Sequence, residues 1–260
     1  QLGGGNPAAL AECARIGAEF GYDEINLNIG CPSNRVANAR FGACLMAEPE
    51  LVANCVAEIR AACDLPVTVK TRVGIDDSKD YEFLDHFVEI VSEGGCKSFI
   101  IHARKAWLQG LSPKQNREIP PLRYELVHRL KRNRPTIEMI INGGFRSLDA
   151  ISEQLKIVDG VMVGREVYEN PYFLTSIEQH HFAPAFALTR QEVLEHMLPY
   201  IERQCADGIP LHRITRHILG LFQGKSGARS WRRHLSQNAH LPGASSEILH
   251  EAARKIAPNL

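Results

Sequence analysis

Short apolar strands alternate with amphipathic helices at regular intervals through residue 164, and this rhythm constrains the fold more than any other feature. The expected strands are 24–30, 67–73, 98–102, 137–142 and 160–164, and the helices that precede them are 7–20, 49–62, 80–93, 121–132 and 147–155. Strands joined through helices form a parallel sheet with right-handed crossovers. We therefore expect an α/β fold.

Polar residues or glycines follow every expected strand, and this separates two kinds of α/β fold. A closed barrel collects functional side chains from several strands at its carboxyl rim. An open doubly wound sheet concentrates them at one or two switch points instead. We therefore expect a (β/α)8 TIM barrel. Because Gln1-Leu2 has the pattern of a strand end, the barrel is expected to be N-terminally truncated and to lack about two strands.

The alternation of helix and strand stops after about Thr189. Helices alone are expected beyond it, over 190–206, 211–222, 226–236 and 246–256. We therefore predict two domains: a catalytic barrel over residues 1–185 and a small all-α helical domain over residues 186–260.

The 30 Lys and Arg balance the 30 Asp and Glu, but the charges are segregated along the chain. Residues 104–134 contain nine basic and two acidic residues, and residues 203–234 contain seven basic residues and one acidic residue. Two basic segments in an otherwise acidic chain indicate a polyanionic partner. The alternative is that both segments form ordinary solvated helix faces.

Composition excludes several other classes of protein. No apolar run approaches the roughly 18 residues of a membrane span, and no basic leader precedes an apolar stretch. The seven cysteines form no Cys-x-x-Cys pair, which fits reduced thiols better than disulfides or a zinc site. We therefore expect a cytoplasmic protein without a metal or a membrane partner. No pattern addresses its oligomeric state, and we expect a monomer.

The segment Asn28–Ser33 carries the clearest chemical signal. Alternation along the strand turns Asn26 and Asn28 toward the barrel interior, where an amide needs hydrogen-bond partners. Cys31 follows at the strand tip, ahead of a proline. A thiol that is protonated at neutral pH can donate a proton, so Cys31 is our candidate general acid. A buried structural cysteine is the alternative.

Two cationic side chains and a histidine are expected near this cysteine. Lys70 and Arg72 share the inner face of the next strand, and a buried cation needs an anion or an electron-rich ligand. Glu138, which also faces inward, is the structural alternative as a partner of Lys70. His102 ends a third strand, and together with Lys70 and Asn28 it indicates the lining of a site for a polar, planar ligand.

The glycine-rich ends of the last two strands indicate a phosphate site. Its expected residues are Asn142, Gly143, Gly144, Gly164 and Arg165. Loop amides and a helix N-terminus bind phosphate at this place in many barrels. Ordinary strand-to-helix turns are the alternative.

Taken together, these motifs resemble the tRNA-dihydrouridine synthases over essentially all 260 residues, although the family's first two barrel strands are absent. The matching segments are Gln1–Gly4, Asn28–Ser33, Lys70–Gly74, His102–Arg104, Asn142–Gly144 and Gly164–Glu166. In the helical domain, Lys225–Arg233 resembles the A-type bacterial subfamily.

The resemblance implies reduction of the C5=C6 bond of a uridine in the tRNA D-loop, at position 20 or 20a. Hydride passes from reduced FMN to C6, Cys31 protonates C5, and NADPH reduces the flavin again. The residues implied in FMN binding are Gln1, Lys70, His102, Asn142, Gly143, Gly144, Gly164 and Arg165. Many family members have an acidic residue in place of Gly144, so the contact of that carboxylate is not carried over.

A uridine inside folded RNA must turn out of its stack to reach a barrel mouth, so residues near the rim must hold the RNA. The implied tRNA contacts are Asn28, Lys114, Arg117, Arg229, Ser230, Arg232 and Arg233. Asn28 orients the uracil, whereas the cations bind phosphates.

Two other functions stay open. A flavin barrel that acts on a free pyrimidine, as dihydroorotate dehydrogenases do, does not need a basic helical domain. A catalytically inactive tRNA-binding fragment binds RNA with steep salt dependence but carries no flavin.

Overall fold

A computed structural model describes residues 1–32, 41–185 and 188–256 of the chain. The chain divides into two compact units, Gln1–Met162 and Val163–Leu260, and each is described by itself. The domain boundary predicted between residues 185 and 186 borders the undescribed residues, so it stays a prediction. Ser33 of the Asn28–Ser33 motif also lies outside the described residues.

The first unit is built on a parallel sheet, which confirms the predicted α/β class. Within the described residues its strands pair in the order β1-β2-β3-β4-β5. Their bounds are β1 Ile25–Asn28, β2 Val67–Arg72, β3 Ser98–His102, β4 Glu138–Asn142 and β5 Gly160–Met162. Leu2 adds a parallel bridge to Leu27 of β1.

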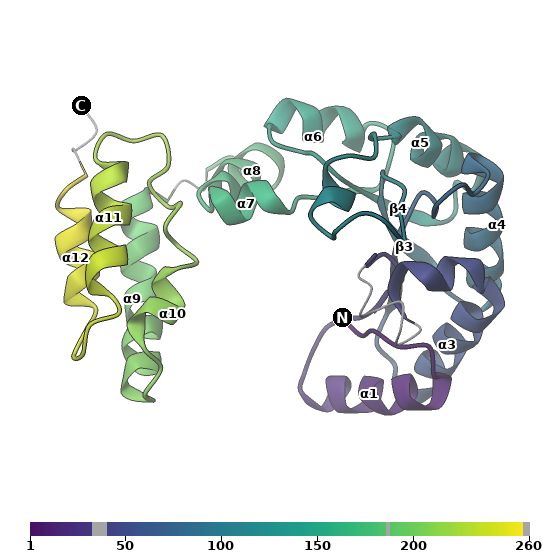
Figure 1. Cartoon of the computed structure of the whole chain (residues 1–260), viewed down its shortest axis with the longest axis horizontal. Coiled ribbons are helices and arrows are strands. Elements are labelled where there is room, and N and C mark those ends of the chain that lie inside the picture. Colours follow the sequence, from purple (N-terminus) through teal and green to yellow (C-terminus); the bar gives the residue numbers. More distant parts are fainter. Residues whose placement is uncertain (33–40, 186–187, 257–260) are drawn as a thin grey trace. The chain divides into compact units, whose positions relative to one another are not determined.

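The α-helices of this unit cover one face of the sheet. They are α1 Pro7–Glu19, α3 Pro49–Ala62, α4 Asp80–Glu93, α5 Tyr124–Asn133 and α6 Leu148–Leu155. Two short 3-10 helices, η1 Gly42–Ala47 and η2 Gln115–Arg117, lie in the segments that follow β1 and β3. Strands that follow chain order need successive right-handed crossovers in the same direction, which puts their helices on the same side. Figure 1 shows α3, α4, α5 and α6 in an arc outside the strands.

Alternation along the strands separates an outer face from an inner one. The outward residues Val69, Phe99 and Ile141 are fully buried beneath the helices. Local signals place the ends of these helices: Asn6 caps α1 by accepting from the backbone N–H of Ala9, and a proline occupies the first position of both α1 and α3. The inner face is therefore free to carry polar side chains.

The second unit is helical. Its elements are α7 Arg165–Glu169, α8 Phe173–His181, α9 Arg190–Ala206, α10 Leu211–Thr215, α11 Ala228–Asn238 and α12 Glu247–Ala253. Trp231, Leu194 and Leu249 are central to its apolar core. Thr189 and Glu192 form a reciprocal capping box at the start of α9, where the sequence predicted a helix to begin.

The predicted helices of this unit were incomplete in one place and too long in another. No helix was predicted over 165–181, where α7 and α8 lie. The helix predicted over 211–222 ends at Thr215, and turns follow it. A Cβ at Gly220 would lie 1.9 Å from the carbonyl oxygen of Glu169, so the chain passes against the end of α7. That close approach decides the backbone path in this segment.

No helix in the described ranges is long and apolar enough to cross a membrane.

Replacing Gly227 should destabilise the second unit more than replacing Gly224. Both glycines have a positive φ, which costs an alanine about 1–2 kcal/mol. A Cβ at Gly227 would also lie 2.1 Å from the carbonyl oxygen of Lys255, whereas nothing lies within 4 Å at Gly224. Urea unfolding followed by circular dichroism should show the larger loss for Gly227→Ala. Equal losses would contradict the close packing at Gly227.

Candidate functional site

Polar side chains line the inner face of the sheet in successive layers. The strand register places Asn26 and Thr68 in one layer, Asn28 and Lys70 in the next, and Arg72, His102 and Asn142 in the third. The third layer lies at the carboxyl ends of β2, β3 and β4, where side chains of separate strands come together.

The first layer is a continuous chain of hydrogen bonds. Gln1 Nε2 donates to Asn26 Oδ1 over 2.6 Å, and Asn26 Nδ2 donates to Thr68 Oγ1 over 2.8 Å. Thr68 Oγ1 then donates to Glu24 Oε1 over 2.7 Å. The buried amide of Asn26 is thus satisfied, and the exposed Gln1 is held beside β1.

Asn28 organises the backbone that carries Cys31. Its side-chain oxygen accepts from the backbone N–H groups of Gly30 (3.1 Å) and Cys31 (3.2 Å). The carbonyl of Cys31 accepts from the N–H of Ala43 over 2.9 Å. The backbone that carries the half-buried thiol is therefore fixed at the tip of β1.

Arg72 is buried and joins two segments that follow different strands. Its Nε donates to the carbonyl of Gly30 (2.8 Å), and Nη1 donates to the carbonyls of Lys105 (2.9 Å) and Asn116 (3.1 Å). Burial lowers the pKa of Arg72 to about 10, and the nearby Cys31 partly offsets this effect. The guanidinium is therefore still charged at neutral pH.

Lys70 forms a hydrogen bond with an amide and, within the part of the chain that the structure describes, no ion pair. Its Nζ donates to Asn142 Oδ1 over 3.3 Å, and Asn142 Nδ2 donates to the carbonyl of Met162 over 2.8 Å. Burial lowers the pKa of Lys70 to about 8, and the charge of Arg72 lowers it further. Glu138, the alternative partner, is exposed at the opposite end of its strand, and no described carboxylate pairs with Lys70.

The backbone after β4 comes close to the ring of His102. Gly143 and Gly144 have φ values of +127° and +79°. A Cβ on Gly143 would lie 2.9 Å from His102 Cδ2, and one on Gly144 would lie 2.8 Å from Leu122 Cδ1. The hydroxyl of Tyr124, which sequence reasoning missed, donates to the carbonyl of Gly143. In this chain glycine avoids backbone strain and these close contacts at both positions, which leaves backbone without side chains at the rim.

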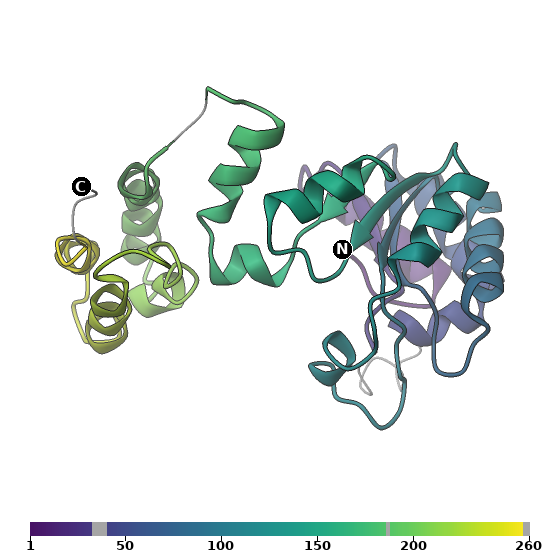
Figure 2. The same cartoon turned by 90° about the horizontal axis from the view of Figure 1, so that it is seen from above.

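A long loop follows β3 over residues 103–123, and we call it the rim loop. It carries Lys114 and Arg117, and both side chains are exposed. Figure 2 shows this loop, with the short turn η2, extending beyond the sheet. The buried Asn116 closes it: its side chain accepts from the N–H of Trp107 and donates to the carbonyls of Trp107 and Leu111. Nothing in the local sequence singled out Asn116, because its partners come from the folded loop.

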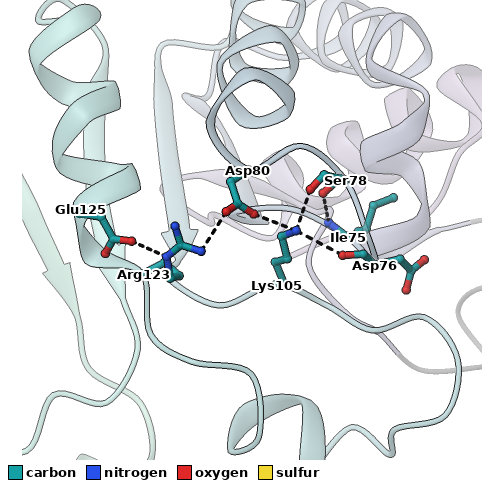
Figure 3. Close-up of polar contacts among 7 residues, drawn as sticks. All are labelled: Ile75, Asp76, Ser78, Asp80, Lys105, Arg123 and Glu125. Atoms are coloured by element: carbon teal, nitrogen blue, oxygen red, sulfur yellow. Dashed lines mark hydrogen bonds and ion pairs between the residues drawn. The ribbon is translucent and has the colours of Figure 1, made fainter.

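A network of ion pairs holds the stem of the loop to neighbouring segments (Figure 3). Lys105 Nζ lies 2.8 Å from Asp80 Oδ1 and donates to the carbonyl of Ser78 over 2.7 Å. Asp80 Oδ2 also pairs with Arg123 over 2.9 Å, and Arg123 contacts Glu125. The hydrogen bond from Lys105 is the main cause that holds the pKa of Asp80 below its usual value.

The two basic segments differ in the structure. In residues 104–134 several cations have partners within the protein: Lys105, Arg123, Lys131 and Arg134 pair with carboxylates, and Arg129 lies over the ring of Tyr81. The charge of this segment is therefore partly neutralised within the protein. In residues 203–234 no described carboxylate forms an ion pair with a Lys or Arg, so this segment keeps its charge available.

The other predicted residues belong to the second unit. Gly164 precedes α7 and Arg165 is its first residue. On α11, Arg229, Arg232 and Arg233 are exposed and Ser230 is half-buried, while Ala228, Trp231 and Leu235 face the core. Where these residues lie relative to the first unit stays a prediction. Within the described ranges, no cluster of His, Cys, Asp and Glu is placed to hold a metal ion.

Comparison with known proteins connects this geometry to a family. A family model described as dihydrouridine synthase (Dus) matches residues 1–257. The tRNA-dihydrouridine(20/20a) synthase of Vibrio vulnificus is 58% identical over 262 residues, covering 100% of this chain and 80% of the relative. The protein of the same name from Shewanella oneidensis is 57% identical over 261 residues, covering 100% of this chain and 78% of the relative.

Replacing Asn116 by alanine should loosen the rim loop without unfolding the sheet. The change removes three partly buried hydrogen bonds and takes away the partner of both backbone groups of Trp107. Hydrogen exchange of the amides in 107–117 should accelerate by about tenfold or more. The adjacent Gln115→Ala, which removes an exposed hydrogen bond to Ser112, is the matched control and should have a smaller effect. Unchanged exchange in Asn116→Ala would contradict this role.

Proposed function

The chain belongs to the dihydrouridine synthase family, and on that premise we propose that it reduces uridine in the D-loop of tRNA to 5,6-dihydrouridine. It is an oxidoreductase, and we assign to it the positions 20 and 20a that its relatives' names carry. The main support is that Lys70 and Arg72 lie on the polar face of a parallel sheet, with Cys31 next to the residue that Arg72 contacts, in a chain that the family model matches.

We further propose that this sheet is part of a (β/α)8 barrel. Its strands follow chain order, and its helices lie on one face while polar layers occupy the other. In a doubly wound sheet the strand order reverses and helices cover both faces. Residues 1–185 are proposed as the catalytic domain and residues 186–260 as the tRNA-binding domain.

The residues of the polar face fit FMN. Lys70 donates to a neutral amide and lacks a described anionic partner, and Gly143 and Gly144 carry no side chains of their own, which suits close approach of a phosphate to their backbone. We propose that FMN is held by Gln1, Lys70, His102, Asn142, Gly143, Gly144, Gly164 and Arg165. Reduced FMN, when bound, supplies a hydride to C6 of the uracil, and NADPH is the proposed external reductant.

Cys31 completes the reduction by donating its thiol proton to C5 of the uracil. Addition at C6 leaves negative charge on C5 and the C4 carbonyl, so the S–H bond breaks as the new C5–H bond forms. Asn28 holds the backbone of Cys31 through its side-chain oxygen. Its amide nitrogen then donates to a uracil carbonyl and orients the base.

Lys70 offsets negative charge that develops in the site. Its pKa of about 8 keeps the ammonium protonated at neutral pH. Arg72 is charged as well, but its Nε and Nη1 donate to the carbonyls of Gly30 and Lys105. It therefore positions the segments that follow β1 and β3.

The tRNA is held by exposed cations of both units. Lys114 and Arg117 lie on the rim loop that Arg72 ties to the cysteine segment. Arg229, Arg232 and Arg233 share the solvent face of α11, with Ser230 beside them, and no described carboxylate neutralises the arginines. These residues are proposed to contact phosphates of the tRNA body.

The purified chain should carry FMN and convert uridine to dihydrouridine in an unmodified tRNA transcript with NADPH. The Cys31→Ala variant should lose turnover, because no proton donor remains, yet keep its visible flavin absorbance. Mass spectrometry of digested tRNA measures the product. Full activity of Cys31→Ala would exclude the acid role. Equal activity of the wild-type chain on free uridine would favour the free-pyrimidine enzyme, and tRNA binding by a colourless protein would favour the inactive fragment.

Affinity for FMN should fall as the pH rises above about 8. The pKa of Lys70 is lowered, so its positive charge is present below that pH and is lost above it. Binding of FMN to the apoprotein should weaken by up to about tenfold per pH unit above 8. Lys70→Arg stays charged and should bind with a flat profile between pH 7 and 9. A wild-type profile that is equally flat would contradict the role of Lys70.

A further inference from the structure

We propose that Trp107 is a stacking platform for a nucleobase of the RNA substrate, on the rim beside the position that receives the uridine. The proposal rests on the proposed function and adds a residue of the rim loop that contacts a base. Trp107 lies on the loop whose stem Arg72 joins to Gly30, the residue before Cys31.

The indole of Trp107 is exposed, although burying an aromatic side chain of this size would stabilise the fold. Its exposed fraction is 37%, whereas the chain's other tryptophan, Trp231, is fully buried in the helical core. Large aromatic side chains gain more from burial than any other residue type. Lys114 and Arg117 are exposed on the same loop. Exposed aromatics interleaved with cations are the usual surface for unpaired nucleotides.

The backbone beneath the indole is held on both sides. The N–H of Trp107 donates to Asn116 Oδ1 over 2.8 Å, and its carbonyl accepts from Asn116 Nδ2 over 2.9 Å. The carbonyl of Asn116 in turn accepts from Arg72. Trp107 is therefore connected through one residue to the buried guanidinium of the candidate site.

The residues on either side of Trp107 are held as firmly. Ala106 donates to the carbonyl of Gly74 and accepts from the N–H of Asp76, and Leu108 donates to Asp76 Oδ1 over 2.8 Å. Lys105 is held by Asp80 and by the carbonyls of Asp76 and Ser78, as Figure 3 shows.

The ordered backbone around Trp107 lowers the entropic cost of binding a base to the exposed indole. Binding normally costs the entropy of ordering the backbone and side chains that make the contact. Here the backbone of four consecutive residues is ordered on folding, and an indole has few remaining rotamers. Most of the stacking free energy then appears as affinity.

An RNA base fits this place better than the adenine of the dinucleotide reductant. A base presents its face to the indole while the phosphates of the same strand reach Lys114 and Arg117, which follow on the same loop. Stacking on an aromatic side chain also suits a strand that is locally unpaired, which extrusion of the target uridine requires.

The test compares Trp107→Ala, Trp107→Leu and Trp107→Phe in the FMN-loaded protein with an unmodified tRNA transcript. Loss of stacking should raise KM for tRNA by about 5- to 150-fold in the alanine and leucine variants. Phenylalanine should restore most of the loss. The kcat at saturating tRNA and KM for NADPH should not change. Ile119→Ala, which removes an exposed apolar side chain from the same loop, is the matched control and should behave as wild type.

A second measurement uses the two tryptophans directly. Binding of tRNA should quench the fluorescence of the wild-type protein, and Trp107→Phe should abolish the quenching because Trp231 is buried. This readout does not need turnover, so it tests stacking even if the proposed reaction is wrong. An unchanged KM in Trp107→Ala, full rescue by leucine, or a change confined to KM for NADPH would each overturn the proposal.

Discussion

Arg72 is buried on the inner face of the sheet, yet its guanidinium contacts backbone carbonyls and pairs with no described carboxylate. Three carbonyls from the segments after β1 and β3 surround it. A buried charge without a partner is costly, so these segments are held where their oxygens solvate the cation. The position of Cys31 and the course of the rim loop both follow from this requirement.

Two residues of the rim loop, Asn116 and Lys105, each contact Arg72 and a second partner. The carbonyl of Asn116 accepts a hydrogen bond from Arg72, and its side chain accepts one from the backbone N–H of Trp107. The carbonyl of Lys105 accepts a hydrogen bond from Arg72, and its ammonium group forms an ion pair with Asp80. The loop therefore has a rigid stem, on which exposed aromatic and cationic side chains are carried. Local sequence shows the exposed residues, but it does not show why they are held still.

Local signals explain which elements could be predicted. Helix α3 has the predicted bounds, and α9 has the predicted bounds as well. In the structure a proline opens α3, and Thr189 and Glu192 form a capping box at the start of α9. Helices α7 and α8 were missed, since neither has a side-chain cap and neither buries a residue fully. The two basic segments looked equivalent in sequence, but among the described residues only the cations of 104–134 pair with carboxylates, and Asp80, Asp85 and Asp159 come from other parts of the chain.

The strand and helix rhythm, the parallel sheet and the polar inner face were determined by the sequence alone, because periodicity and capping act within a few residues. The candidate residues Asn28, Cys31 and Lys70 could be named for the same reason. Tertiary structure alone decided that Arg72 donates to backbone carbonyls and that Glu138 lies away from Lys70. It also decided that Asp80 forms ion pairs with Lys105 and Arg123. Those outcomes depend on which groups meet across loops far apart in the chain, and burial then determines which charges must be paired.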